Sequence, residues 1–335
     1  MEYTLHTTFP QELQGEWNAL LDETPSHVPF LRHEYLSTWT LTCGGGEWQQ
    51  IDAAIVTARD GDRLAGICPL FLDHQHNPPR LMLLGSIEIS DYLDLLARPA
   101  DLTNFVDGLL PFLVESIPGW KSLDLYNLLE DSPTLPVLES AAARLGWQIQ
   151  VERLQHAPYI PLPGAWDAYL AGIAKTQRHE LRRKMRRLEE SGLPSRWYLV
   201  EDSAGLERGI DEFMALMEQD PEKAAFLTPA MREHMRLTLR CAHREGCLHL
   251  AFLEIDGRKA AAYLSFDYLN RIWVYNSGLD RSFMEFSPGW VLLGYLLQWA
   301  NENQRSEFDF MRGDEEYKYR FGAVDRFVMR AVLTR

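Results

Sequence analysis

Two stretches of the chain carry apolar, strand-like runs on both sides of the same turn. Residues 51–73 and 248–268 each have such runs before and after an Asp-Gly pair, at 60–61 and at 256–257. Short apolar runs bounded by turn residues are typical of strands, and Asp-Gly between two strands is a strong signal for a tight hairpin. The sequence therefore predicts one β-hairpin in each half of the chain.

The segments after the two hairpins correspond in kind and in order. Each hairpin leads to an apolar strand, a helix-length segment and a further strand with a central aspartate. These are 81–85, 101–117 and the strand around Asp124 in the first half, and 271–276, 288–303 and the strand around Asp309 in the second. The preserved order predicts a duplicated domain of α/β class with mixed α+β sheets, whereas chance recurrence of hairpins and helices is the alternative.

A strongly basic segment lies between the two copies. Seven lysines and arginines fall within 175–187, in a stretch that is rich in helix formers and stops at Gly192. We expect a helix over 166–191 at the junction of the domains. The predicted domains are 1–160 and 161–335, with this helix at the start of the second.

The basic helix has two interpretations. Arg178 and Arg182 lie on successive turns and are candidates for binding a phosphate-bearing substrate. The alternative is a solvated helix face, balanced by Glu180, Glu189 and Glu190.

Composition narrows the class of protein. A chain of 335 residues with 46% apolar residues suits two folded domains, and a net charge of −15 argues against a DNA-binding or anionic-membrane surface. Four scattered cysteines with no secretory leader lead us to expect a reduced, cytoplasmic setting. The longest apolar stretch, around 290–300, is too short for an integral membrane segment.

Most catalytic signatures are absent. The sequence has no G-x-S-x-G, H-E-x-x-H, P-loop or strand-linked G-x-G-x-x-G motif, so the serine hydrolase, zincin, P-loop and Rossmann interpretations lose their main support. His74 and His76 have no further metal-ligating residue at a spacing typical of metal sites, so we predict no metal site.

A helix start in the second half could hold a phosphate. The strand 271–276 runs into Ser277 and Gly278, and the next helix opens with Ser287-Pro288-Gly289. Free N–H groups and the positive end of the helix dipole attract anions, and Gly289 lets a ligand approach the backbone. The same residues also make an ordinary helix start.

The stretch "EFDFMRGDEEYKYRFG", residues 307–322, ends a strand in a cluster of charges. Asp309 and Asp314 are candidate general bases, and Tyr317 is a candidate proton donor. Arg312 and Lys318 are candidates for binding an anionic acceptor. The alternative is a purely structural network that fixes a loop between the domains.

A strand end in the first half offers two more candidates. Asp91 and Tyr92 follow an apolar strand and are candidate substrate-binding residues. Equally, they could simply turn the chain.

A set of motifs is spread over nearly the whole chain. They are Pro29-Phe30-Leu31 through Glu34, Pro69-Leu70, Ser90-Asp91-Tyr92-Leu93-Asp94, the helix from Lys175, Tyr275-Asn276-Ser277-Gly278 with Asp280, Ser287-Pro288-Gly289, and 308–318. Together these motifs resemble the CelD-like acetyltransferase family, within the GNAT superfamily, and the most specific part is R-G-D-x-x-Y-K at 312–318.

The resemblance implies two tandem GNAT-like acyltransferase domains, similar to the Fem-type aminoacyl transferases. It implies acyl-CoA as co-substrate, with its pyrophosphate on the turn 279–289, which places Ser277, Gly278, Ser287 and Gly289 at the cofactor. The chain lacks the glycine-rich Q/R-x-x-G-x-G/A motif of simple GNAT enzymes. The first copy, which has carboxylates where an anion would have to lie, is expected not to bind CoA.

The leading functional hypothesis is an N- or O-acyltransferase. It would move an acyl group from acetyl-CoA or another acyl-CoA to an amine or hydroxyl of a small or sugar-linked acceptor, in exopolysaccharide or cell-envelope metabolism as the resemblance implies. One alternative is a Fem-like transferase that uses aminoacyl-tRNA, which only the basic helix supports and which the negative net charge disfavours. The other is a non-catalytic protein that binds an acylated ligand.

Overall fold

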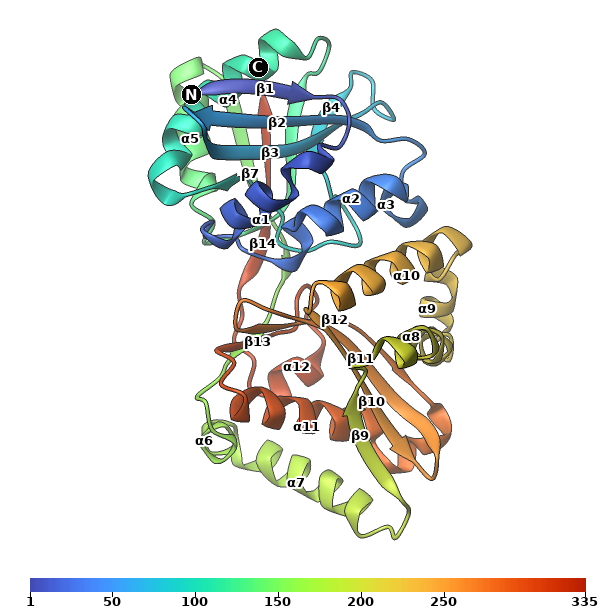
Figure 1. The fold of residues 1–335 in the computed structure, drawn as a ribbon. Coiled ribbons are helices and arrows are strands. Elements are labelled where there is room, and N and C mark those ends of the chain that lie inside the picture. The colour runs from blue at the N-terminus through green and yellow to red at the C-terminus, as the bar shows by residue number, and fades with distance from the viewer. The chain divides into compact units, whose positions relative to one another are not determined.

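The computed structural model describes all residues, 1–335, and the chain forms two compact units (Figure 1). Residues 1–155 and 326–335 make the first unit, and 156–325 make the second. The boundary expected from the sequence is 160/161, with all of 161–335 in the second domain. The difference arises because the last strand pairs with strands of the first unit.

The first unit is built on one mixed sheet with the strand order β1-β2-β3-β4-β6-β14-β7, while β5 pairs with β3. Its strands are β1 (Glu2–His6), β2 (Asp52–Asp60), β3 (Arg63–Asp73), β4 (Arg80–Leu83), β5 (Leu96–Ala97), β6 (Ser122–Leu129), β7 (Gln148–His156) and β14 (Phe327–Thr334). Its helices are η1 (Gln11–Leu13), α1 (Gln14–Asp22), η2 (Pro29–Leu31), α2 (His33–Leu41), α3 (Cys43–Gly46), α4 (Pro99–Ser116) and α5 (Thr134–Leu145).

The second unit has a six-stranded sheet in the order β8-β13-β12-β11-β10-β9. Its strands are β8 (Tyr159–Pro161), β9 (Ser195–Leu199), β10 (Leu248–Ile255), β11 (Arg258–Tyr268), β12 (Arg271–Leu279) and β13 (Glu307–Asp309). Its helices are α6 (Trp166–Gly172), α7 (Lys175–Glu189), α8 (Ser203–Met217), α9 (Pro221–Phe226), α10 (Pro229–Arg244), η3 (Arg281–Phe286), α11 (Pro288–Glu302) and α12 (Glu316–Arg320).

The two sheets share the strand order that the sequence predicts. Strands β2-β3-β4-β6 of the first unit correspond to β10-β11-β12-β13 of the second, and in both sets only the last pair is parallel. A helix crosses between the parallel strands in each unit, α4 in the first and α11 in the second. The duplicated mixed α/β fold is therefore confirmed.

Helix α11 covers one face of the second sheet and α8 the opposite face. Leu279 of β12 contacts α11, because a Cβ placed on Gly289 would lie 2.9 Å from the Leu279 side chain. The preceding residue, Gly278, lies against α8, where a Cβ would be 2.7 Å from backbone atoms of Leu216. Successive residues of a strand point to opposite faces, so the two contacts place the helices on opposite sides.

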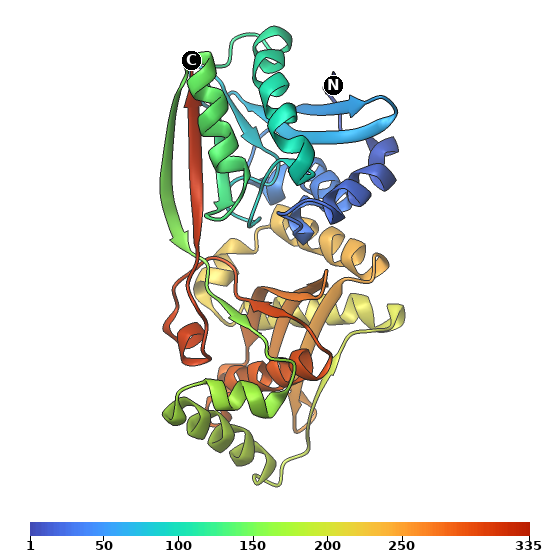
Figure 2. The same ribbon diagram turned by 90° about the vertical axis from the view of Figure 1, so that its left-hand side faces the viewer.

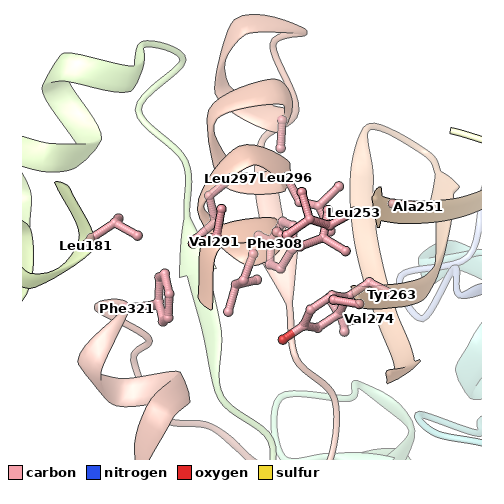
Figure 3. Close-up of a cluster of buried hydrophobic side chains, with 14 of the residues drawn as sticks. Leu181, Ala251, Leu253, Tyr263, Val274, Val291, Leu296, Leu297, Phe308 and Phe321 are labelled. Atoms are coloured by element: carbon pink, nitrogen blue, oxygen red, sulfur yellow. The ribbon is translucent and has the colours of Figure 1, made fainter. Parts of the chain in front are cut away.

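The basic helix is part of the second unit rather than a link between the units (Figures 1 and 2). The predicted helix 166–191 is two helices, because Ile173 and Ala174 adopt extended backbone between α6 and α7. Leu181 and Leu188 of α7 are buried in the core, and Figure 3 shows Leu181 pointing toward the cluster around Val291. A Cβ at Gly294 of α11 would lie 2.9 Å from Leu181, so glycine there permits close approach of the two helices.

Candidate functional site

Strand β12 pairs with β13 only over its first third. The parallel pairing runs only from Arg271 to Trp273, opposite Glu307 to Asp309. The register with β11 then shifts between Leu264 and Ser265, which leaves Tyr275 as an extra, bulged residue. From Asn276 onward, the β12 edge away from β11 has no strand partner. A bulge beside an open edge is a common feature of binding sites.

A pocket of about 410 Å³ lies at this open end of β12. Its walls come from the end of α8, from α9, from β12 and from η3. The residues that line it are Leu216, Met217, Gln219, Asp220, Lys223, Ser277, Gly278, Leu279, Arg281 and Met284. Ser277 and Gly278, predicted from the sequence as cofactor-binding residues, are therefore pocket residues.

Lys223 is a pocket residue that the sequence analysis missed. Its ammonium donates to the Ser277 carbonyl oxygen at 2.5 Å and lies 3.4 Å from the Ser277 Oγ. Burial lowers its pKa, and the charges of Asp220 and Glu315 offset this only in part. A lone lysine in a short polar helix carries no sequence pattern that marks it as functional.

Tyr263, Tyr317 and Glu315 are electrostatically linked to one another, and Glu315 also acts on Lys223. Tyr263 of β11 pairs with Ser277 across the strands, and burial raises its pKa. Burial also raises the pKa of Tyr317, with smaller contributions from Tyr263 and Glu315. The Glu315 carboxylate thus influences Lys223 and both tyrosines, so these side chains share one electrostatic environment.

The loop after β13 is held by Lys318. Only 3% of this side chain is exposed, and its ammonium donates to the carbonyl oxygens of Arg312 (2.9 Å) and Gly313 (3.0 Å) and to Glu315 Oε2 (2.8 Å). An ammonium has three donors, so all of them are engaged by the loop itself. Gly313 adopts a φ of 107°, and its N–H donates to the His156 carbonyl oxygen at 2.8 Å.

The three predicted catalytic residues lie in different environments. Asp309 is fully buried and accepts the Met311 N–H at 2.7 Å. Asp314 is exposed and makes no hydrogen bond or ion pair. The Tyr317 ring contacts Phe310 edge to face, with 5.9 Å between the ring centroids.

Ser287 occupies the N-cap position of α11, as predicted, but its hydroxyl makes no capping hydrogen bond. The residue is in the left-handed region, with φ 52° and ψ 54°. Pro288 has no N–H, and the N–H groups of Gly289 and Trp290 precede the first intrahelical bond, which Val291 donates to Ser287. The two N–H groups of this first turn are available to an anion.

The arginines of α7 differ in their contacts. Arg178 donates to the Leu170 carbonyl oxygen at 3.0 Å, whereas Arg183 forms two hydrogen bonds with Glu180. Arg178 and the exposed Arg182 have no contact partner in common. Four cations of α7 are exposed and make no hydrogen bond or ion pair: Lys175, Arg182, Arg186 and Arg187.

In the first unit, Asp91 and Tyr92 are buried, with 8% and 1% exposed. The Arg326 guanidinium lies over the Tyr92 ring at 5.1 Å. Asp94 accepts hydrogen bonds from the hydroxyls of Ser26 and Ser132, and burial raises its pKa despite them. The loop that carries these residues is thus fixed within its own unit.

The loop after β4 is tied to β6 by Asn127. Its side-chain amide donates to the carbonyl oxygens of Ile87 and Ser90, both at 2.9 Å. In the second unit, the corresponding strand end leads instead to the pocket beside Ser277.

The two histidines of the 74–76 segment each pair with one carboxylate, His74 with Asp52 and His76 with Asp73, both at 2.8 Å. The structure contains no group of three or more histidine, cysteine, aspartate or glutamate side chains that could hold a metal ion. None of its helices combines the length and the apolar character needed to cross a membrane.

Comparison with known families finds one match. Residues 175–319, which form most of the second unit, match the family described as acetyltransferase (GNAT) domain. The match begins at the first residue of α7, which agrees with the place of the basic helix inside this unit. No curated protein sequence matches the chain.

Solved structures with the same fold cover nearly the whole chain. FemX superposes with a TM-score of 0.68 at 12% identity, over 99% of this chain and 97% of FemX. A conserved protein of unknown function from Bacteroides thetaiotaomicron gives 0.64 at 11% identity, over 100% of both chains. L-PGS from Bacillus licheniformis gives 0.57 at 12% identity, over 95% of this chain and 90% of that one. At such identities the likeness shows the fold alone, and the CelD-like resemblance stays a prediction.

Proposed function

We propose, on the premise that residues 175–319 are a GNAT acetyltransferase domain, that the protein is an acyltransferase with its reaction site in the second unit. The observation that carries this proposal is the 410 Å³ pocket at the open, bulged end of β12. The donor is acetyl-CoA or another acyl-CoA. The acceptor is an amine or a hydroxyl of a small or sugar-linked molecule.

The donor would lie between the pocket and the first turn of α11. Ser277 and Gly278 line the pocket, and the free N–H groups of Gly289 and Trp290 suit the donor's pyrophosphate. Gly278 matters for shape, because any side chain there would collide with the α8 backbone and move β12.

Acyl transfer needs a proton acceptor for the attacking group and a proton donor for the leaving thiolate. Asp314 suits the first task because it is exposed and unpaired, whereas Asp309 is fully buried. Tyr317 suits the second, because its raised pKa keeps the hydroxyl protonated at neutral pH. The attacking nitrogen or oxygen bonds to the acyl carbon, the carbon–sulfur bond breaks, and the thiolate takes a proton.

The first unit is proposed to serve structure rather than donor binding. Asn127 binds the loop at the corresponding strand end, and the buried Asp94 would oppose an anion. Asp91 and Tyr92 remain candidates for acceptor binding.

Calorimetry with acetyl-CoA and free CoA tests the donor, and thiol release with a panel of amino sugars, amines and polyols tests the reaction. Binding of both compounds and acceptor-dependent thiol release are expected. Binding without turnover for any acceptor would favour a non-catalytic acyl-ligand-binding protein. Absence of binding would remove acyl-CoA as the donor.

A second candidate is transfer from aminoacyl-tRNA. The four unpaired cations of α7 favour it, since they offer phosphate contacts on an otherwise acidic protein. Binding of tRNA that weakens steeply with salt would support this candidate, whereas salt-independent or absent binding would exclude it.

A further inference from the structure

The pocket beside β12 contains a cation without a counter-ion. Lys223 is half-buried and lines the pocket, and its only hydrogen-bond partners are the two oxygens of Ser277. It forms no ion pair with a carboxylate, although Asp220 and Glu315 act on it from farther away. Because an ammonium has three donors, at least one is left for a ligand.

The backbone at Ser277 is already satisfied by side chains of this chain. Its carbonyl oxygen accepts from Lys223, and its N–H donates to the Asn276 side-chain oxygen at 2.8 Å. A ligand that paired with the β12 edge as an added strand would have to compete at this position with Lys223 for the carbonyl oxygen and with Asn276 for the N–H. Recognition in the pocket therefore falls to side chains.

The position of Lys223 is fixed by the start of α9. Asp220 Oδ1 accepts the N–H groups of Glu222 and Lys223 at 3.0 and 3.3 Å, so it caps this short helix. Asp220 Oδ2 forms an ion pair with Arg281 at 3.6 Å, and the Arg281 side chain is 65% exposed. The pocket thus has two cations and one carboxylate, which caps α9 and pairs with Arg281 but makes no ion pair with Lys223.

We propose that this pocket binds an oxyanion of a small ligand, a phosphate or a carboxylate, on the Lys223 ammonium, with Arg281 as the second cation. The Ser277 oxygens offset only part of the desolvation of the half-buried Lys223 ammonium, and an anion at hydrogen-bond distance would offset more of it. The Ser277 hydroxyl and the Gln219 side-chain amide are further donors in the pocket wall. The inference goes beyond acyl transfer and holds whichever donor the enzyme uses.

The first experiment uses the wild-type protein and simple anions. Inorganic phosphate, pyrophosphate, acetate and succinate are each titrated at constant ionic strength against chloride. Acylation of Lys223 by acetic anhydride is measured by peptide mass spectrometry, together with the melting temperature. We expect at least one oxyanion to protect Lys223 and to raise the melting temperature, and the preference for phosphates or carboxylates then identifies the ligand group.

Variants provide the second test. Lys223→Met should abolish the anion-dependent change in melting temperature, whereas Lys223→Arg, which keeps the charge, should retain it. Lys259→Met is the matched control, because Lys259 pairs with Glu254 at 2.6 Å and does not line the pocket. If Lys223→Met does not fold, the proposal is tested by the protection of Lys223 in the wild type and by the anion-dependent change in melting temperature of Lys223→Arg.

Two results would overturn the proposal: no oxyanion protects Lys223, or the Lys223→Met variant responds to anions as the wild type does. Competition with CoA shows whether the bound anion occupies the donor site or the acceptor site. An anion displaced by CoA marks a donor subsite, and an anion that binds together with CoA marks an acceptor subsite. Failure of CoA to bind at all would count against the proposed donor and leave the anion measurements valid.

Discussion

The Lys318 ammonium lies 2.8 Å from the Glu315 carboxylate, three residues earlier in the chain. The same ammonium also holds the carbonyl oxygens of Arg312 and Gly313. A single buried lysine thus fixes the loop that carries the proposed proton acceptor, Asp314.

Replacement of this lysine should destabilise the protein. In Lys318→Met, each carbonyl oxygen left without its donor costs about 1–3 kcal/mol if it stays buried. We expect a melting temperature several degrees lower, measured by scanning calorimetry. Lys121→Met, at an exposed site, is the control, and an unchanged melting temperature in Lys318→Met would refute the structural role.

Asp314 and Asp309 should respond differently to the same change. Asp314→Asn keeps the shape of an exposed side chain, so kcat should fall roughly 10²- to 10⁴-fold with the fold intact if this residue is the base. Asp309→Asn alters a fully buried carboxylate and should lower thermal stability. Single-turnover rates and melting curves on both variants check this. Two active variants that merely melt earlier would leave the loop as a structural clasp.

Gly289→Asp should weaken CoA binding without loss of stability. It places a negative charge at the first turn of α11, where charge favours the helix but repels the donor's pyrophosphate. The added Cβ meets only the flexible tip of Leu279. Calorimetric affinities for Gly289→Asp and for the uncharged control Gly289→Ala separate charge from size, and equal affinities would place the donor elsewhere.

Arg182→Glu and Arg183→Glu form a matched pair on α7. Arg182 is exposed and unpaired, whereas Arg183 is already engaged by Glu180. If α7 binds a phosphate-bearing acceptor or tRNA, Arg182→Glu should raise the KM for the acceptor or the Kd for tRNA more than Arg183→Glu does. Equal, small effects would indicate a solvated face.

Stability should fall in mild acid because of His249. Burial lowers the pKa of this histidine to about 4, and neither ring nitrogen has a hydrogen-bond partner. Its unfolded pKa is about 6.5, so between pH 6.5 and 4 the unfolded state binds more protons. Stability is therefore fully present above pH 6.5 and declines below it by up to about 1.4 kcal/mol per pH unit for this group.

Urea unfolding at pH 7 and pH 5 measures the effect. His249→Phe, which retains an aromatic ring against Trp299, should have a smaller loss between the two values than the wild type. His234, whose pKa burial also lowers to about 4, contributes a similar loss and remains in both proteins.

Local patterns predicted the elements and much of their arrangement. The hairpins and the order of strand, helix and strand are visible in the sequence because Asp-Gly turns, apolar runs and helix caps act over a few residues. They sufficed for β10–β13, α11 and the duplicated topology. They also pointed to Ser277 and Gly278, and both residues line the pocket.

Features that depend on distant contacts were not predictable in this way. Nothing near Val332 indicates that it pairs with Asp124, and nothing near Lys223 indicates that it reaches the Ser277 carbonyl oxygen. The Ser-Pro-Gly pattern predicted the start of α11 but not the left-handed backbone of Ser287, which turns its hydroxyl away from capping.

Strand β14 lies between β6 and β7 of the first sheet, although the whole second unit separates it from them in sequence. Arg330 of this strand forms hydrogen bonds to both oxygens of the buried Asp124. During synthesis on the ribosome, residues 1–155 must therefore emerge with β6 and β7 unjoined, and the Asp124 carboxylate can pair only with Arg80 until Arg330 arrives. The first unit to begin is the last to be completed, so chaperone dependence should be set by how quickly residues 327–334 follow the second unit out of the exit tunnel.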